Sequence, residues 1–591
     1  MIRLEGKSVR LLDPEMLRRE ADNRSYMLSL TRENLMRNYM MEAGLWSDAR
    51  LDPGIHGGWE SPTCALRGHF TGHYLSACAM ICHSREDPEI LGRAQAMVHD
   101  LALCQKEHGN GWAGSIPEKY LEWIARGKPV WAPHYTVHKT LQGLVDMAVL
   151  TGSREALEIA DAWGGWFDHW TQNFSRETMD DILDVETGGM LEVWADLLSL
   201  TGESRYRRLL ERYTRSRLFT PLLKGQDKLT NMHANTTIPE ILGCARAWEV
   251  TGNSMWREIV EAYWKCAVTD RGFYVTGGQT DGEVWSPMRD LSRRLGRKNQ
   301  EHCTVYNMIR LADTLLRWTG DPLYADYMEL NRINGIMAQG YYRYMPVTGY
   351  TPDHPETGLV SYFLPMRGGD HKGWGSATTD FFCCHGTLLQ ANAAHNRHIA
   401  YLDEEDLYIC QYLDSDLMFT LRDTPVTLHL RVDPCENGSD GLSDTPQGSH
   451  PEKIRLVITV DTPRPVPLRL HVRLPQWSSG EASRWLHVPE GETVFSLDLP
   501  MHLRAQSLPG DPGRVAFLFG PTVLAGLTDR EETLHVSPLC PQSALRRENE
   551  REWSSWRDEF ITVTQDRAIR FVPLWTVGYE PYTLYFRLDD K

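Results

Sequence analysis

A helical unit repeats along the first two-thirds of this chain, and the repeat limits the folds that the chain can adopt. In each copy an apolar helical pattern runs into Thr-Gly, and a polar turn and a second helical pattern follow. The plain copies are residues 140–163, 190–213, 238–264 and 305–331, with the glycines Gly152, Gly202, Gly252 and Gly320. Glycine adopts the left-handed conformation of a helix C-cap at little cost. Each copy is therefore predicted to be a helical hairpin.

Two further units extend the repeat to six. A looser copy covers residues 72–105, and residues 386–402 form a sixth first helix, for which the amphipathic stretch from Pro14 to Arg37 can supply the partner. Hairpins of this kind cannot bury their apolar faces alone and must stack on one another. We therefore predict an (α/α)6 barrel whose inner helices all begin at one mouth, where the connecting loops gather histidine, tryptophan, glycine and cysteine.

The pattern changes to short alternating strands after about Leu402. The strand-like segments are residues 417–433, 452–461, 468–475, 493–500, 514–527 and 582–590, separated by Pro, Gly, Asp and Asn turns. We therefore predict a mainly α protein with β, in which a barrel domain at residues 1–402 precedes one or two β-sandwich domains at residues 403–591.

Charge and composition limit the partners and the compartment. Lys+Arg 62 against Asp+Glu 79 give a formal net charge of −17 without a long block of either sign, which argues against nucleic acid and an anionic membrane as partners. The first residues have no secretory signal pattern, and no window has the roughly 20 apolar residues that span a bilayer. The twelve cysteines are scattered, as reduced thiols would be. We expect a cytoplasmic protein, and exposed β-sandwich domains favour a homodimer.

Four residues form a candidate metal site. Cys383 and Cys384 precede the sixth inner helix, and Glu301 and Cys303 stand in the same relation to the fifth. Neighbouring helices bring these side chains together at the mouth, where three sulfurs and one carboxylate suit zinc. The helix N-termini lower thiol pKa values, and one bound thiolate can act as a nucleophile. The alternative is that the cysteines are small buried hydrophobic residues.

Glu283 is the candidate general acid. It lies in the loop before the fifth inner helix, beside glycines and Trp285, and such surroundings can raise the pKa of a carboxyl group. The alternatives are a solvated loop glutamate at this position, or Asp281 as the acid.

Histidines and aromatic residues at the mouth are the candidate substrate-binding residues. The histidines are His69, His73, His134, His138 and His233, and the rings that can stack on a sugar are Trp59, Trp131, Tyr135 and Trp285. For any single histidine a structural role is the more common one, and for the aromatic rings core packing is an equal alternative. Five histidines at one mouth favour hydrogen bonding to a polyhydroxylated ligand.

With these residues in place, the sequence resembles glycoside hydrolase family 127, the β-L-arabinofuranosidase family. The resemblance covers most of residues 55–402 and touches the C-terminal part. It rests on RGHFTGHYLSA, WAPHYTVHKTLQGLVD, ETGGMLEVWADL, MHANTTIPEILGCARAWEVTG, the stretch from Glu301 to Gln339, FFCCHGT and GRVAFLFGPTVLAG.

The resemblance implies a barrel catalytic domain with β-sandwich domains that hydrolyses a terminal β-linked L-arabinofuranose, or a related pentose, with retention of configuration. It implies that Glu301, Cys303, Cys383 and Cys384 bind Zn²⁺, that Cys383 is the nucleophile and that Glu283 is the acid and base. Small plant-derived oligosaccharides are the expected substrates. The chain departs from the family pattern at His302 and at residues 385–388, which border the sugar, so the chemistry transfers better than the substrate.

Two other functions remain open at this stage. (α/α)6 barrels also carry sugar lyases and epimerases, which would use histidine or tyrosine with a carboxylate and would not need the cysteines. A carbohydrate-binding protein with a structural zinc would have a closed metal site and no turnover.

Overall fold

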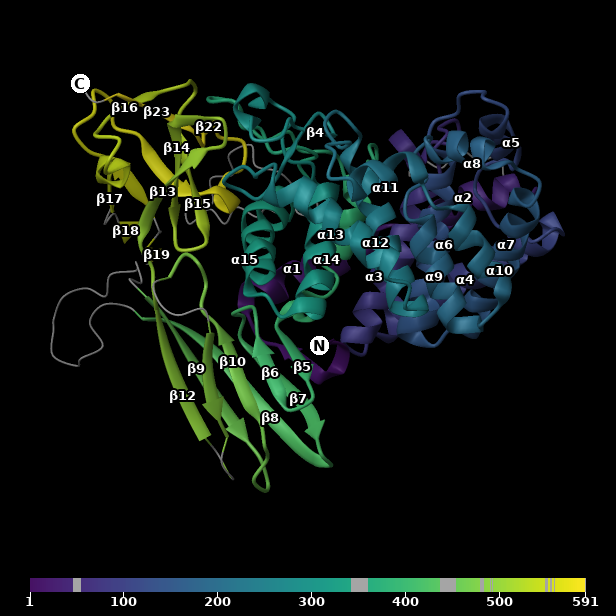
Figure 1. Ribbon diagram of the computed structural model, residues 1–591, viewed down its shortest axis with the longest axis horizontal. Helices are drawn as coiled ribbons and strands as arrows, with labels where there is room; N and C mark the ends of the chain where they lie inside the picture. The colour runs from purple at the N-terminus through teal and green to yellow at the C-terminus, as the bar shows by residue number, and fades with distance from the viewer. Residues whose placement is uncertain are drawn as a thin grey trace.

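The computed structural model describes residues 1–45, 55–341, 360–435, 453–478, 483–488, 491, 493–547, 551–552, 555–556 and 559–589. The helices form one side of the molecule and the sheets lie beside them in two groups (Figure 1). Among the described residues, no helix is long and apolar enough to cross a membrane. Eleven of the described cysteines are free thiols, and most of these are buried.

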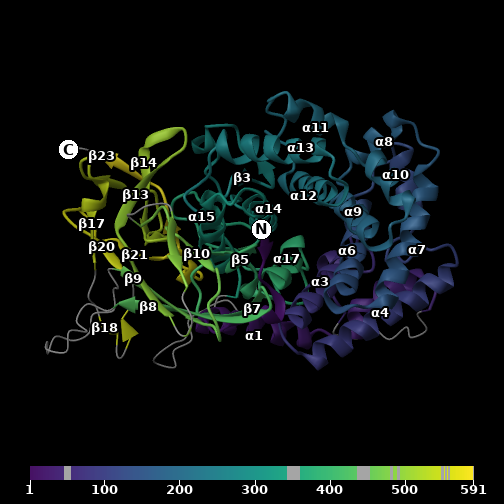
Figure 2. The same cartoon turned by 60° about the horizontal axis from the view of Figure 1, so that its bottom comes forward.

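Six helices form a closed ring. They are α3 (His69–Ser84), α6 (Pro133–Thr151), α9 (Met190–Thr201), α12 (Ala234–Thr251), α14 (His302–Thr319) and α17 (Cys383–Ala391). Each packs against the next, and α17 packs against α3, so that the labels follow one another around a circle in Figure 2. The ring brings the N-terminal ends of successive helices to the same side.

A second helix lies outside each of the first five ring helices. These are α4 (Pro88–His108), α7 (Arg154–Thr171), α10 (Ser204–Arg212), α13 (Ser254–Trp264) and α15 (Pro322–Asn331), packed against α3, α6, α9, α12 and α14 respectively. Gly152, Gly202, Gly252 and Gly320 end the inner helices with φ of 74°, 72°, 69° and 71°. The helical hairpins and their glycine C-caps are therefore confirmed.

The predicted outer helix between Pro14 and Arg37 is two helices, α1 (Pro14–Ser29) and α2 (Arg32–Glu42). Thr31 begins α2, because its hydroxyl accepts a hydrogen bond from the Asn34 amide. Helix α1 reaches α17 through the Asn23 side chain, which donates to the Leu389 carbonyl at 2.9 Å, whereas α2 packs against α4 and α3. The shorter helices are α5 (Lys119–Ala125), α8 (Arg176–Leu183), α11 (Ser216–Leu223) and α16 (Met337–Gln339).

Two five-stranded sheets pack face to face. One has the order β1 (Ile2–Arg3), β5 (Ala400–Asp403), β6 (Asp406–Ile409), β10 (Arg469–Arg473), β11 (Ser483–His487), and the other β12 (Thr493–Pro500), β9 (Lys453–Asp461), β8 (Thr424–Cys435), β7 (Ser415–Leu421), β2 (Val9–Leu11). Leu470 of the first sheet and Ile458 of the second belong to one hydrophobic core, which makes the pair a β-sandwich. Two of its strands come from before residue 12, so the sandwich is not built only from residues after 402. The domain division itself stays a prediction.

A third sheet packs against the helical part. Its order is β16 (Thr533–His535), β23 (Phe586–Asp589), β14 (Asp511–Phe519), β15 (Thr522–Leu527), β21 (Arg570–Pro573), β20 (Phe560–Thr562), β17 (Leu545–Arg547), with β13 (Leu503–Leu508) on β14 and β22 (Tyr582–Thr583) on β15. Leu518 and Val523 share a core with Tyr274 and Ala338 of the helical part. Two hairpins complete the strands, β18 (Arg551–Glu552) with β19 (Ser555–Trp556), and β3 (Thr280–Asp281) with β4 (Val284–Trp285).

Candidate functional site

The four predicted ligands meet where α14 and α17 begin. Glu301 is the N-cap of α14 and Cys303 lies in its first turn, while Cys383 and Cys384 are the first residues of α17. One possible ligand atom from each residue lies within 4.8 Å of the other three. The four side chains therefore converge as the sequence analysis predicted, because the ring places the N-termini of two neighbouring helices side by side.

The cluster is compact and buried. Cys303 Sγ lies 3.4 Å from Cys384 Sγ, and Cys383 Sγ lies 3.5 Å from Glu301 Oε1 and 4.0 Å from Cys384 Sγ. Cys383 is 6 % exposed and the other three residues are 0 % exposed. Glu301 Oε2 is buried without a hydrogen-bond partner among the described residues. A buried carboxylate with one unsatisfied oxygen, beside three thiols, is the arrangement expected of a cation site.

The protein alone keeps only one of these groups readily ionised. Burial raises the pKa values of Glu301, Cys303 and Cys384 well above their usual ranges. Burial also opposes ionisation of Cys383, but hydrogen bonds with Cys303, Cys384 and Tyr362 outweigh it and hold the pKa of the Cys383 thiol well below its usual range. A bound cation would allow all four groups to lose their protons together.

Glu283 faces the cluster across a tyrosine hydroxyl. Glu283 stands at the tip of the β3–β4 hairpin with φ of 70°. The Tyr362 hydroxyl donates a hydrogen bond to Glu283 Oε1 and lies 3.4 Å from Cys383 Sγ. A bridge between the backbones of Glu301 and Phe363 holds Tyr362 in this place. The competing Asp281 instead lies 4.0 Å from Arg294, so the hairpin directs Glu283 rather than Asp281 to the cluster.

His233 and His69 adjoin the site. His233 caps α12 by accepting from the Thr236 amide, and its Nε2 lies 3.9 Å from Glu283 Oε2. Both of these side chains are 33 % exposed, which makes them the open edge of the site. His69 is fully buried, with Nε2 2.9 Å from the Phe381 carbonyl and Nδ1 3.0 Å from the Tyr135 hydroxyl. Its contacts therefore hold the segment that precedes Cys383.

His73 and His138 lie deeper in the ring. His73 Nδ1 is 2.6 Å from Gln390 Oε1, and its ring lies against Gly386. His138 lies against Gly189, and neither of its ring nitrogens has a hydrogen-bond partner among the described residues. Both residues line a cavity behind the cluster.

Two predicted substrate-binding residues are packed in the core. His134 is buried among Phe167, Trp170 and Tyr213, and its Nε2 is 3.1 Å from the Tyr213 hydroxyl. Trp285 is 0 % exposed, and its indole N–H donates to the Thr237 hydroxyl at 3.1 Å. Neither placement supports contact with a substrate, because both rings are enclosed by core residues.

The remaining candidate rings stand nearer the surface. Trp131 is 49 % exposed and packs edge-on against Trp59, which also contacts the His69 and Phe382 rings. Tyr135 connects this group to the cluster through its hydrogen bond to His69.

The sequence analysis gave no specific role to three residues of the site. Tyr362 bridges Cys383 and Glu283, and Thr387 Oγ1 lies 3.2 Å from Cys303 Sγ. Glu186, in the ETGGM segment, has a pKa raised by burial and by the nearby Glu283 and Cys383. Glu186 could have been found from the sequence, since its segment leads into an inner helix. Tyr362 could not, because a pairing between distant parts of the chain brings it to the cluster.

The sequence matches a known protein family. The family profile for the β-L-arabinofuranosidase GH127 catalytic domain matches residues 8–397. No curated protein sequence matches the chain.

Solved structures share the fold over the full chain. A GH127 β-arabinofuranosidase superposes with a TM-score of 0.72 at 16 % identity, covering 100 % of this chain and 98 % of the other. A GH127 β-L-arabinofuranosidase from Geobacillus stearothermophilus T6 gives 0.70 at 16 % identity, covering 98 % and 100 %. A structure described as a glycoside hydrolase gives 0.60 at 14 % identity, covering 94 % and 95 %.

Proposed function

The chain belongs to the β-L-arabinofuranosidase family GH127, and on this premise we propose that it is a retaining glycosidase that releases terminal β-L-arabinofuranose from small plant-derived oligosaccharides. In this proposal the helical ring is an (α/α)6 barrel that carries the site at its mouth. The observation that supports the chemistry best is the Tyr362 hydroxyl shared between the Glu283 carboxylate and Cys383 Sγ.

The proposed cofactor is Zn²⁺ held by Glu301, Cys303, Cys383 and Cys384. With zinc–sulfur bonds of about 2.3 Å and a zinc–oxygen bond of about 2.0 Å, tetrahedral angles separate two sulfurs by about 3.8 Å and a sulfur and an oxygen by about 3.5 Å. The sulfur–sulfur distances of 3.4 and 4.0 Å and the sulfur–oxygen distance of 3.5 Å fit these edges. When bound, zinc would keep the Cys383 sulfur ionised and stabilise it as a leaving group.

The proposed reaction has two displacements. The Cys383 thiolate attacks the anomeric carbon while the glycosidic C–O bond breaks, and the Glu283 carboxyl gives its proton to the leaving oxygen. Glu283, now a carboxylate, then takes a proton from water, which attacks the same carbon and breaks the C–S bond. The thiolate is regenerated, and two inversions give net retention.

The spacing of the two groups supports retention rather than inversion. Glu283 and Cys383 contact the same hydroxyl, so two hydrogen-bond lengths limit their separation to about 6 Å. In glycosidases with two carboxylates, a separation of about 5–5.5 Å accompanies retention and about 6.5–9.5 Å accompanies inversion. A separation within this limit is shorter than the range that accompanies inversion.

The test combines metal content with turnover of p-nitrophenyl β-L-arabinofuranoside. We expect about one zinc ion per chain and a loss of kcat/KM of at least about 100-fold in Cys383→Ser and in Glu283→Gln. Asp281→Asn is the matched carboxylate control and Cys78→Ser, in α3, the matched buried-thiol control. NMR of the first product should give the β-anomer.

Three results would contradict the proposal. Turnover that survives Cys383→Ser would exclude the thiolate nucleophile, and an α-anomer as the first product would exclude retention. Zinc without turnover of any pentoside would indicate a carbohydrate-binding protein with a structural metal.

A further inference from the structure

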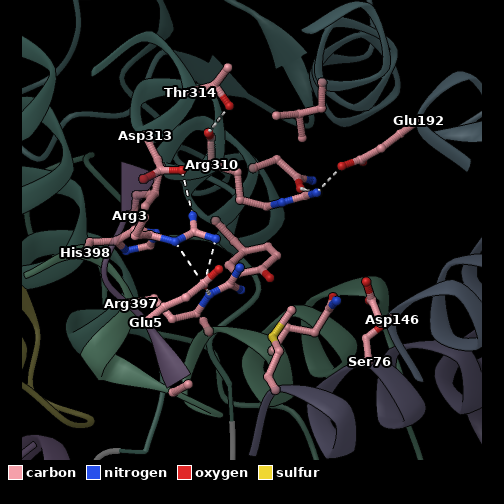
Figure 3. A pocket seen from close by; sticks show the side chains of 18 of the residues that line it. Arg3, Glu5, Ser76, Asp146, Glu192, Arg310, Asp313, Thr314, Arg397 and His398 are labelled. Atoms are coloured by element: carbon pink, nitrogen blue, oxygen red, sulfur yellow. Dashed lines mark hydrogen bonds and ion pairs between the residues drawn. The ribbon is translucent and has the colours of Figure 1, made fainter. Parts of the chain in front are cut away.

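Two acidic side chains in the interior of the helical ring are each paired with an arginine. Asp313 Oδ2 lies 2.7 Å from Arg3 Nη1, and Glu192 Oε1 lies 2.6 Å from Arg310 Nη2, as Figure 3 shows. A carboxylate that leaves water needs such a partner, because its charge is otherwise poorly solvated. These two acids therefore have a structural role that their arginines already satisfy.

Glu186 is a carboxylate at the mouth of the ring that has no such partner. It is partly buried, and among the described residues nothing forms a hydrogen bond or an ion pair with its carboxylate. Burial raises the pKa of this carboxyl group, Glu283 and Cys383 add to the rise, and His233 opposes it. These influences place Glu186 within electrostatic reach of the two proposed reacting groups. A partly buried acid without a protein partner is available to a ligand.

Contacts from two neighbouring helices fix the segment that carries Glu186. The Thr187 hydroxyl donates to Glu240 Oε1 of α12 at 3.4 Å. On the other side, Gly189 lies so close to α6 that a Cβ would be 2.6 Å from His138 Nε2. Helices α6 and α12 both begin at the mouth, and α9 packs against both of them. The segment before α9 is therefore held in place at the mouth.

The backbone at Glu186 is strained. Its φ is 26°, in the left-handed region that residues other than glycine rarely adopt. Glu283, at the tip of the β3–β4 hairpin, has the same feature with φ of 70°. Such strain persists where the surrounding structure imposes it, and it is concentrated at functional sites. The strain therefore agrees with a Glu186 side chain that is needed at the mouth.

A free carboxylate at this place suits the hydroxyl groups of a sugar. Its two oxygens accept hydrogen bonds, and bonds to an ionised acceptor are stronger than those between neutral groups. Cys383 and Glu283 both act on the anomeric carbon in the proposed reaction, so a carboxylate close to both lies beside the same sugar ring. Proton transfer does not need Glu186, because the Tyr362 hydroxyl links Cys383 to Glu283.

We propose that Glu186 is a specificity-determining residue whose carboxylate accepts hydrogen bonds from hydroxyl groups of the arabinofuranose held between Cys383 and Glu283. The inference rests on the proposed function, and it adds recognition of the sugar to the chemistry at the anomeric carbon. Glu186 makes and breaks no covalent bond. A site with such an acceptor rejects an analogue that lacks the matching hydroxyl, since the acceptor is then left without a partner.

The test compares p-nitrophenyl β-L-arabinofuranoside with its 2-deoxy, 3-deoxy and 5-deoxy forms on the zinc-loaded enzyme. We expect Glu186→Gln and Glu186→Ala each to lower kcat/KM on the parent substrate by at least about 10-fold. The loss should be at least about threefold smaller on the deoxy substrate that lacks the partner hydroxyl, because the wild type has then lost the same hydrogen bond. Glu203→Gln is the matched control, since Glu203 is exposed beyond the other end of α9.

A binding measurement makes the test independent of turnover. The probe is 1,4-anhydro-L-arabinitol, which has the same furanose ring and hydroxyl groups but no leaving group. In isothermal titration the wild type should bind this ring at least about 10-fold more tightly than Glu186→Gln does. Zinc content and the melting temperature establish that the cluster and the fold of each variant are intact. If Glu186→Ala does not fold, Glu186→Gln decides, because it keeps the size of the side chain.

Two results would overturn this inference alone. Equal losses on all four substrates, with ring binding unchanged, would mean that Glu186 acts through Glu283 rather than on the sugar. Changes within about twofold in both experiments would make Glu186 a solvated residue of the loop.

Failure of the proposed function gives a different result. If the wild type binds the ring but hydrolyses no pentoside, the proposed function fails, and the binding by Glu186→Gln still decides the role of Glu186. A wild type that neither binds the ring nor hydrolyses pentosides would overturn both.

Discussion

Replacing Tyr362 with phenylalanine tests whether the two reacting groups depend on the hydroxyl between them. The substitution removes the hydrogen bond to Glu283 Oε1 and the 3.4 Å contact to Cys383 Sγ while keeping the ring. A hydrogen bond to a charged group contributes about 1.5–3 kcal/mol, and about 1.4 kcal/mol corresponds to a tenfold change in rate. If this interaction is made in the transition state, kcat/KM falls roughly 10- to 150-fold.

The assay is hydrolysis of p-nitrophenyl β-L-arabinofuranoside, with zinc measured on the same preparation. Tyr206→Phe is the matched control, because the buried Tyr206 hydroxyl donates to Asp161 Oδ1 at 2.6 Å on the outer layer of helices. It should lower the melting temperature and leave kcat/KM unchanged. The reasoning is refuted if Tyr362→Phe retains its zinc and stays within twofold of the wild-type kcat/KM.

Three further predictions concern the metal and the stability of the fold. Gly386→Ala should weaken zinc binding at least tenfold, because a Cβ at this position would lie 2.2 Å from the His73 ring and displace the start of α17. Gly373→Ala is the control, because a Cβ at Gly373 has open space around it. Equal zinc content of both variants in a titration would contradict this prediction. Removal of the metal with dipicolinate should abolish turnover and lower the melting temperature. Zinc should restore both, and magnesium should restore neither. An unchanged melting temperature would contradict the idea that the metal holds α14 and α17 together. Lys372 is 1 % exposed, and burial lowers its pKa to about 7. The folded state therefore binds fewer protons than the unfolded state between about pH 7 and about pH 10. The free energy of unfolding should rise by about 4 kcal/mol relative to Lys372→Met across this interval, from about 1.4 kcal/mol per pH unit. A constant difference between the two proteins in urea unfolding would contradict this.

The convergence of the four candidate metal ligands could be predicted from the sequence because it depends on local features. Glu301 and Cys383 each begin a helix, and helices that follow one another in a ring place their N-termini together whatever the lengths of the loops. The glycines that end the inner helices carry the same kind of local information, since a left-handed residue is needed there.

Other parts of the site depend on contacts that the sequence pattern does not contain. Tyr362 reaches the cluster because its neighbour Phe363 pairs with Glu301, and no periodicity predicts such a bridge. Trp285 was a candidate for stacking on the sugar, but Glu283 stands in the turn of the β3–β4 hairpin with φ of 70°, outside the strand that carries Trp285. The hairpin therefore buries the tryptophan against Thr237 while the glutamate faces the cluster. Strands of two or three residues, such as β1 and β2, are too short to show an alternating pattern.

The pairing of the first strands with the last third of the chain sets an order for folding. Ile2 pairs with Leu402 and Val9 with Leu417, so closing this contact in an unfolded chain of roughly 400 residues costs about 5 kcal/mol of entropy. At about 5–20 residues per second, a ribosome needs roughly 20–80 s to make the partner strand. The helices can pack during that delay and shorten the distance that the first strand must bridge. Until then the edges of both sandwich sheets are open, and a variant that slows the helical ring would expose nascent chains to one another at these edges.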